Sequence, residues 1–251
     1  MPVLDEAAVE QWAADTFASL GYVVAQGTDL DNAGERGDSQ QFILQGRVLA
    51  ALHQLNPTLT HDVCEQVMRT LARAPHATLI QNNRWFHSQL TDGVEVEFRD
   101  PASGETRGGR ARLLDFENPA QNQFLLVRQL AFTGPAGKLI RPDLTVFLNG
   151  LPLAAIELKD PADPEADLNT AIDQFRRYMR HAPDSFIPNV FLAVSDGLLT
   201  RTGSLTSGPS RFMPWRADAG GEPTLEALIR GLFDPARLLD FLQTCVTFEE
   251  D

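Results

Sequence analysis

The amino-acid sequence predicts an α/β fold, in which a mixed sheet is flanked by helices and preceded by a mostly helical N-terminal part. Helical periodicity dominates residues 1–90, whereas short apolar runs separated by turn residues dominate the second half. Residues 141–160 contain two apolar stretches, one on either side of Asn149-Gly150, a dipeptide typical of tight hairpins. Strands this apolar are expected where helices cover both faces of a sheet.

The N-terminal part is expected to hold four helices and one strand. Residues 5–20 predict a helix that begins at an Asp5 cap and ends at Gly21. Residues 22–25 predict a short strand, and residues 27–38 a polar, glycine-rich loop. Three further helices are expected over residues 42–55, 61–74 and 79–90.

Strands predominate in the second half. Residues 94–99 alternate apolar and charged side chains, which is typical of a half-exposed strand. Further strands are expected over residues 113–116, 124–132 and 190–194, with an edge segment at 211–216. Helices are expected over residues 165–181, 225–232 and 235–245.

The length fits one large domain, for which we expect three parts. Residues 1–90 form the helical N-terminal part, residues 91–200 the core, and residues 201–251 a closing segment of strand and helix.

Composition restricts the function. The net charge of −13 argues against a domain that grips nucleic acid by itself. No apolar run reaches membrane-spanning length, so we expect no membrane partner. Cys64 and Cys245 match no zinc-binding spacing, which favours a reduced, cytoplasmic location.

Charged side chains interrupt the central hairpin at Asp143, Glu157 and Lys159, where burial is costly unless they are paired or bind something. Glu157 and Lys159 lie two residues apart and therefore share one face. A plain two-residue turn would pair Asp143 with Ile156, so that the two carboxylates face opposite ways. A three-residue loop or one bulge would set Asp143 opposite Glu157, and we predict that odd register.

Such a trio suits metal-assisted phosphodiester hydrolysis. Two carboxylates supply the oxygen ligands that Mg²⁺ prefers, with Mn²⁺ as a substitute. Lys159 would hold the attacking water or stabilise the pentacoordinate phosphate. The alternative is an ordinary salt bridge of Lys159 with Glu157 or Asp143, and a bare Glu-x-Lys motif by itself favours that alternative.

Further residues extend the pattern. In the helix expected over residues 165–181, Gln174 and Tyr178 are four apart and project from one flank. The set Asp143, Glu157-x-Lys159 and Gln174-x-x-x-Tyr178 resembles the PD-ExK nucleases, and its last part looks like that of the restriction (R, HsdR-like) subunit of type I restriction enzymes. Similarity to that subunit extends over NNRWFHSQLTDG, DFENPAQNQFLLVRQL, NGLPLAAIELKDP, SDGLLTRTGSLT and RFMPWR.

The resemblance implies a restriction-endonuclease-like fold and a Mg²⁺-dependent DNA endonuclease. Asp143 and Glu157 would hold the metal, and Lys159 would assist the water. Gln174 and Tyr178 would orient this machinery. Glu10, from an early helix, would add an acid near the metal, or it could equally be an ordinary exposed helix residue. DNA phosphates would meet an arginine patch that could equally be a solvated helix face: Arg141, Arg176, Arg177 and Arg180.

The resemblance also implies partners. Double-stranded DNA would be the substrate, and methylase and specificity subunits would recognise the target. Cleavage would follow ATP-driven translocation by motor domains. The sequence has no GxxxxGK[ST] phosphate-binding loop, so it looks like the nuclease portion of a longer chain.

Two alternatives remain open. One is another PD-ExK nuclease, such as a repair exonuclease or junction resolvase, against which the end-to-end similarity argues. The other is a catalytically silent docking module, which no substitution in the trio supports.

Overall fold

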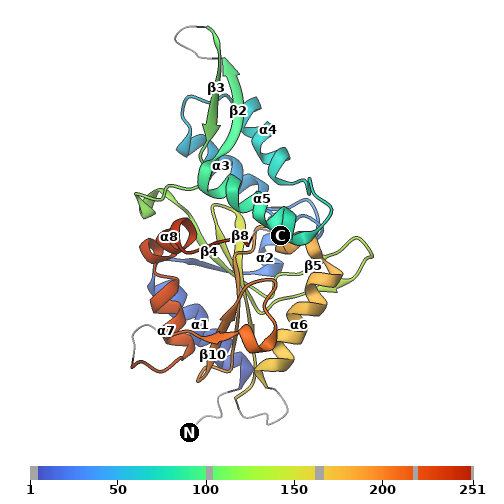
Figure 1. Ribbon diagram of the computed structural model, residues 1–251, viewed down its shortest axis with the longest axis vertical. Helices are drawn as coiled ribbons and strands as arrows, with labels where there is room; N and C mark the ends of the chain where they lie inside the picture. The colour runs from blue at the N-terminus through green and yellow to red at the C-terminus, as the bar shows by residue number, and fades with distance from the viewer. Residues whose placement is uncertain (1–4, 100–103, 162–166, 217–219, 250–251) are drawn as a thin grey trace.

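The computed structural model describes residues 5–99, 104–161, 167–216 and 220–249. Within them a seven-stranded mixed sheet has the order β1-β4-β7-β8-β9-β10-β11. Figure 1 shows α1 and α7 on one side of this sheet and α6 on the other. The α/β class with a mixed, helix-flanked sheet is confirmed, and it is consistent with a restriction-endonuclease-like fold.

The helices are α1 (Glu6–Ser19), α2 (Gly27–Asn32), α3 (Gln45–Leu55), α4 (His61–Leu71), α5 (Leu79–Asp92), α6 (Leu168–His181), α7 (Leu225–Leu232) and α8 (Pro235–Thr244). The large sheet contains β1 (Val23–Gln26), β4 (Phe124–Arg128), β7 (Leu144–Leu148), β8 (Leu151–Leu158), β9 (Phe191–Ser195), β10 (Thr200–Gly203) and β11 (Met213–Pro214). Two small hairpins pair β2 (Val94–Arg99) with β3 (Thr106–Ala111) and β5 (Phe132–Thr133) with β6 (Leu139–Ile140).

The first helix forms as its sequence predicts. The Asp5 side chain accepts a hydrogen bond from the backbone N–H of Ala8 at 2.8 Å, which caps α1. After α1, Gly21 takes a φ of +90°, and the chain turns into β1, which pairs in parallel with β4. The N-terminal part therefore supplies an edge strand and a covering helix to the main sheet.

Three expectations about local structure were wrong. Residues 27–32 form α2 rather than loop, because Leu30 is buried among polar neighbours. Residues 113–116 are not a strand; the strand that pairs with β2 is β3, which begins at Thr106 and ends at Ala111. The strand expected over residues 124–132 breaks at Gln129, whose φ is +52°.

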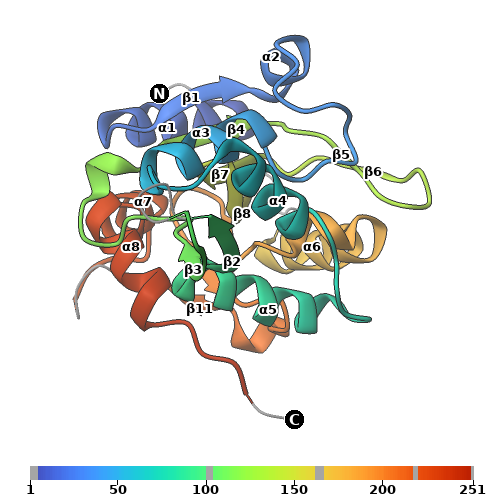
Figure 2. The same cartoon turned by 90° about the horizontal axis from the view of Figure 1, so that it is seen from above.

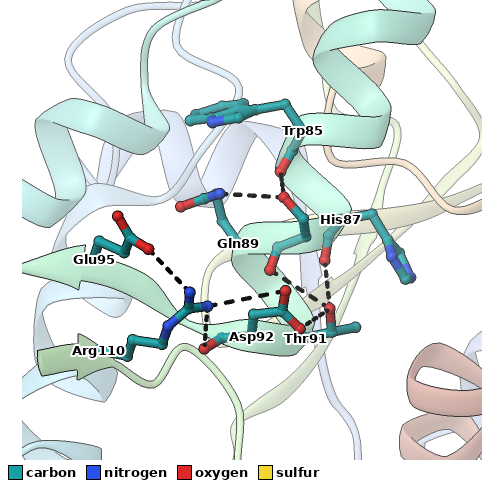
Figure 3. Close-up of polar contacts among 8 residues, drawn as sticks. Trp85, His87, Gln89, Thr91, Asp92, Glu95 and Arg110 are labelled. Carbon is teal, nitrogen blue, oxygen red and sulfur yellow. Dashed lines mark hydrogen bonds and ion pairs between the residues drawn. The ribbon is translucent and has the colours of Figure 1, made fainter.

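The β2–β3 hairpin projects beyond the sheet beside α4 (Figure 1). Figure 3 shows how its base is fixed to the end of α5. Arg110 donates to the Glu95 carboxylate at 3.0 Å and to the Asp92 carbonyl at 3.3 Å. Thr91 donates to the His87 carbonyl at 3.2 Å within α5. Of these contacts, the bond from Arg110 to the Asp92 carbonyl joins the hairpin to α5, and exposed contacts of this kind contribute little stability each.

The central hairpin has the predicted odd register. Its turn is the two-residue type, with φ of +51° at Asn149 and +83° at Gly150. A bulge then leaves Leu153 unpaired, so that Leu144 pairs with Ile156. The turn is held under α3, where the Leu44 N–H donates to the Gly150 carbonyl at 2.9 Å. In Figure 2, α3 and α4 lie over this end of the sheet.

Helix α6 begins at Leu168, after an Asp167 cap, and the start expected at residue 165 lies outside the described residues. Its apolar side, including Ile172 and Phe175, is buried. Its C-terminal end is seated against Gly134, where an added Cβ would overlap the His181 carbonyl. The expected strand at 190–194, edge segment at 211–216 and two last helices are confirmed as β9, β11, α7 and α8. None of the described helices is long and apolar enough to cross a membrane.

Candidate active site

Two carboxylates meet where β8 ends, at the edge of the sheet far from the β2–β3 hairpin (Figure 1). The hairpin register, extended by one residue beyond Leu144, sets Asp143 opposite Glu157. The Leu158 N–H donates to Asp143 Oδ2 at 2.7 Å, which ties the Asp143 side chain to β8. Asp143 is 8% exposed and Glu157 is 0% exposed.

Because Asp143 and Glu157 are buried side by side, a negative charge on both carboxylates is unfavourable. Neither oxygen of Glu157 accepts a hydrogen bond from a described residue. Burial and the adjacent Asp143 carboxylate raise the pKa of Glu157 well above its ordinary value, and Lys159 opposes that rise. Burial also raises the pKa of Asp143, against the opposing effect of the bonds from Leu158 and Gln129. This site would favour a bound cation.

Lys159 is held by α6 more than by its own strand. Its Nζ lies 4.0 Å from Glu157 Oε2, a loose ion pair, and donates to Gln174 Oε1 at 3.2 Å. Gln174 Nε2 donates to the Tyr178 hydroxyl at 2.7 Å, which in turn donates to the Arg141 carbonyl at 3.2 Å. Burial, followed by Glu157, raises the pKa of Tyr178 to about 12, so the phenol keeps its proton.

Glu10 is linked to the site by two residues where β4 ends, Arg128 and Gln129. Its Oε1 accepts from Arg128 Nε at 2.6 Å, and its Oε2 accepts from Gln129 Nε2 at 2.7 Å. The same Gln129 nitrogen donates to Asp143 Oδ1 at 3.0 Å. The structure thus brings together all six catalytic and supporting residues singled out from the sequence.

Sequence reasoning missed Arg128, Gln129 and Glu6. The first two form a polar pair after an apolar strand, next in the chain to the expected hairpin, and that position was the available signal. Glu6 lies one helical turn before Glu10 on α1. Partial burial and the Asp143 carboxylate raise the pKa of Glu6, and Lys159 lowers it, which indicates that Glu6 also lies near the site.

The four arginines do not form one cluster with the carboxylates. Arg176 pairs with Asp173 at 2.9 Å on the surface of α6. Arg141, Arg177 and Arg180 are exposed. Arg177 lies three residues after Gln174 and so shares its flank of the helix. Their contact with DNA phosphates stays a prediction.

The residues present fit a hard divalent cation. Among the described residues no group of three or more His, Cys, Asp or Glu side chains could hold a metal. Mg²⁺ does not need such a cage, because it is usually bound by one or two carboxylates, waters and substrate phosphates. The two Glu157 oxygens, which accept no hydrogen bond from a described residue and lie beside Asp143, match that requirement.

Comparisons with known proteins place the whole chain beside one family. The family described as type I restriction enzyme R protein N terminus matches residues 3–211. The chain is 34% identical over 260 residues to the type I restriction enzyme HindI endonuclease subunit of Haemophilus influenzae, covering 99% of this chain and 24% of that protein. It is 29% identical over 267 residues to the putative type I restriction enzyme MjaIXP endonuclease subunit of Methanocaldococcus jannaschii, covering 96% and 25%. The chain therefore spans about a quarter of the length of these relatives.

Proposed function

The chain belongs to the family of type I restriction enzyme R protein N termini, and on that premise we propose that it is a Mg²⁺-dependent endonuclease domain that hydrolyses DNA phosphodiester bonds. The two relatives described above are named as endonuclease subunits, which supports a nuclease. The observation that carries the proposal is the fully buried Glu157 carboxylate, which accepts no hydrogen bond from a described residue and lies opposite Asp143. A purely structural carboxylate would be expected to have hydrogen-bond donors.

Asp143 and Glu157 would hold the cation. When bound, Mg²⁺ would neutralise charge on the phosphate and lower the pKa of the attacking water. The Lys159 ammonium has three N–H donors, of which Gln174 takes one. The others can point at the water or a phosphate oxygen. Gln174 and Tyr178 fix the ammonium in that position through the Arg141 carbonyl.

The substrate and partners follow from the family. We propose double-stranded DNA as the substrate, with methylase and specificity subunits choosing the target. Motor domains using ATP would deliver the DNA, and a cytoplasmic location would suit such an enzyme. The relatives are about four times as long as this chain, which leaves room for those activities elsewhere. The net charge of −13 fits DNA that is delivered rather than captured.

Crystals soaked in Mn²⁺ test the proposal through anomalous scattering. We expect a peak about 2.0–2.2 Å from carboxylate oxygens of Asp143 and Glu157. The same soak of Glu157→Ala crystals should lose this peak and keep any surface peaks. Surface peaks with no peak at the carboxylate pair in the unmodified chain would contradict the proposal.

A further inference from the structure

Gln129 occupies an unusual place beside the carboxylate pair. Its backbone N–H donates to the Asp143 carbonyl at 2.9 Å, so the two residues lie side by side, Gln129 just after β4 and Asp143 just before β7. Its φ of +52° lies in the left-handed region, which residues with a side chain rarely adopt. Backbone outliers of this kind often mark functional positions, and the contacts of the side chain show what this one does.

The Gln129 side chain joins two carboxylates. Its Nε2 donates to Glu10 Oε2 at 2.7 Å and to Asp143 Oδ1 at 3.0 Å, which engages both N–H bonds of the amide. A neutral amide can bridge two carboxylates without altering the charge of the site. A lysine or arginine here would cancel charge that a cation needs, and a glutamate would repel both neighbours.

Gly27, the first residue of α2, packs against the backbone of Gln129. A Cβ added to Gly27 would lie 2.7 Å from the Gln129 carbonyl oxygen and 2.7 Å from Leu130 Cα. Gly27 therefore allows α2 to approach Gln129 closely, and this contact supports its left-handed conformation.

The bridge also decides what Glu10 can do. Both Glu10 oxygens already accept strong hydrogen bonds, from Arg128 at 2.6 Å and from Gln129 at 2.7 Å. Neither oxygen of Glu157, in contrast, accepts a hydrogen bond from a described residue, and its one ion pair, with Lys159, is loose at 4.0 Å. Glu10 is thus held as a hydrogen-bond acceptor, and Glu157 is held ready for a ligand.

We propose that Gln129 is a positioning residue that fixes the Asp143 carboxylate for cation binding, and that Glu10 acts through Gln129 rather than as a metal ligand. The inference rests on the proposed function, because it assigns a role in the same site. Residues that orient metal ligands typically contribute 10- to 100-fold to metal affinity. Losing the bridge would leave the Asp143 carboxylate held by the Leu158 N–H alone, with its Oδ1 no longer oriented by the Gln129 amide.

Calorimetric titration of the 251-residue chain with Mn²⁺ tests this. Gln129→Met keeps the size of the side chain and removes its donors, so Mn²⁺ should bind about tenfold more weakly or worse. Glu10→Gln should also weaken binding. Added to Gln129→Met, it should cost less than about threefold more, because both changes break one bridge.

Two control variants separate positioning from general stability. Gln123→Met changes an exposed glutamine just before β4, and Ile229→Val trims the core under α7. Both should bind Mn²⁺ within about twofold of the unmodified chain. A loss for Ile229→Val as large as that for Gln129→Met would overturn the positioning role.

The remaining outcomes distinguish this inference from the proposed function. If Asp143→Asn abolishes Mn²⁺ binding and Gln129→Met does not weaken it, the inference fails and the function stands. A further tenfold loss on adding Glu10→Gln to Gln129→Met would make Glu10 a ligand and overturn its indirect role. If the unmodified chain binds no Mn²⁺, or Asp143→Asn binds it equally well, both fail.

Discussion

Asp143 lies opposite Glu157 because Leu153, three residues past Gly150, has no partner on β7. That bulge offsets the register set by the two-residue turn, which would otherwise put Asp143 across from Ile156. The carboxylate pair is therefore created by one extra residue in one strand. Because the pair is buried and its charges are close, the protein should be sensitive to the protonation of Glu157.

Glu157→Gln should stabilise the metal-free chain at neutral pH. The folded pKa of Glu157 is raised above its ordinary 4.5, so the stability this group contributes is present below about pH 4.5 and is lost as the pH rises through the folded value. The glutamine of the variant does not ionise, so the variant does not lose stability in this way as the pH rises. Melting temperatures in EDTA should thus be similar for both proteins near pH 4 and higher for the variant at pH 7–8.

Glu97→Gln is the matched control for this measurement, because it removes the same charge from an exposed position on the β2–β3 hairpin. It should show no pH-dependent difference of this size. A Glu157→Gln variant that melts lower than the unmodified chain at pH 8 would show that the buried charge is stabilised by the fold.

Lys159→Ala should reduce DNA cleavage about 100-fold or more, the loss expected for a group that acts on the reacting water. The assay uses a complete restriction enzyme in which this chain is the nuclease domain. Lys159→Arg should not restore it, because a planar guanidinium cannot replace a compact ammonium between Glu157 and Gln174. Plasmid linearisation rates measure the effect. Lys138→Ala, at the other, exposed lysine, should cleave normally. Normal cleavage by Lys159→Ala would remove the lysine from the mechanism.

Tyr178→Phe should slow cleavage about tenfold, since it removes the hydroxyl that links Gln174 to the Arg141 carbonyl. Gln174→Leu should cost at least as much. The double variant should be no slower than Gln174→Leu alone, because both residues act on Lys159 through one chain of hydrogen bonds. If the loss in the single-turnover rate of the double variant equals the product of the two single losses, Tyr178 acts separately, for example on DNA.

Gly150→Ala should destabilise the chain by about 1–3 kcal/mol. Its φ is +83°, and a Cβ there would lie 2.7 Å from the Leu44 carbonyl oxygen. Gly46→Ala is the matched control in α3, where nothing lies within 4 Å of an added Cβ. It should stabilise by up to about 1 kcal/mol because alanine favours helix. Urea unfolding measures both, and equal midpoints would contradict the strain argument.

Much of this arrangement was predictable because its signals are local. Asp5 and Gly21 mark the ends of α1, and Asn149-Gly150 specifies the turn. The spacing of Gln174 and Tyr178 predicts their shared flank. Even the odd register followed from asking how Asp143 and Glu157 could work together. The sequence left open whether a longer loop or a bulge produces it, because Leu153 differs in no visible way from its apolar neighbours.

Other features depend on contacts between distant segments. Strand β3 carries Gly108, Gly109 and several charged or polar residues, so it has no alternating apolar pattern and forms by pairing with β2. Gln129 offers no sequence sign of its left-handed backbone. Its partners, Glu10 and Gly27, lie about a hundred residues earlier in the chain. Helix α2 is too short for its periodicity to be read.

The hydrogen-bonded chain from Lys159 to the Arg141 carbonyl makes the position of the ammonium depend on how α6 is seated. That helix packs against β8 and β9, and its far end abuts Gly134, beyond the sheet. A displacement of about 1 Å is enough to cost a catalytic group much of its effect. Displacement of α6 would therefore move the Lys159 ammonium relative to Glu157, and in the proposed site it would weaken the contribution of that lysine.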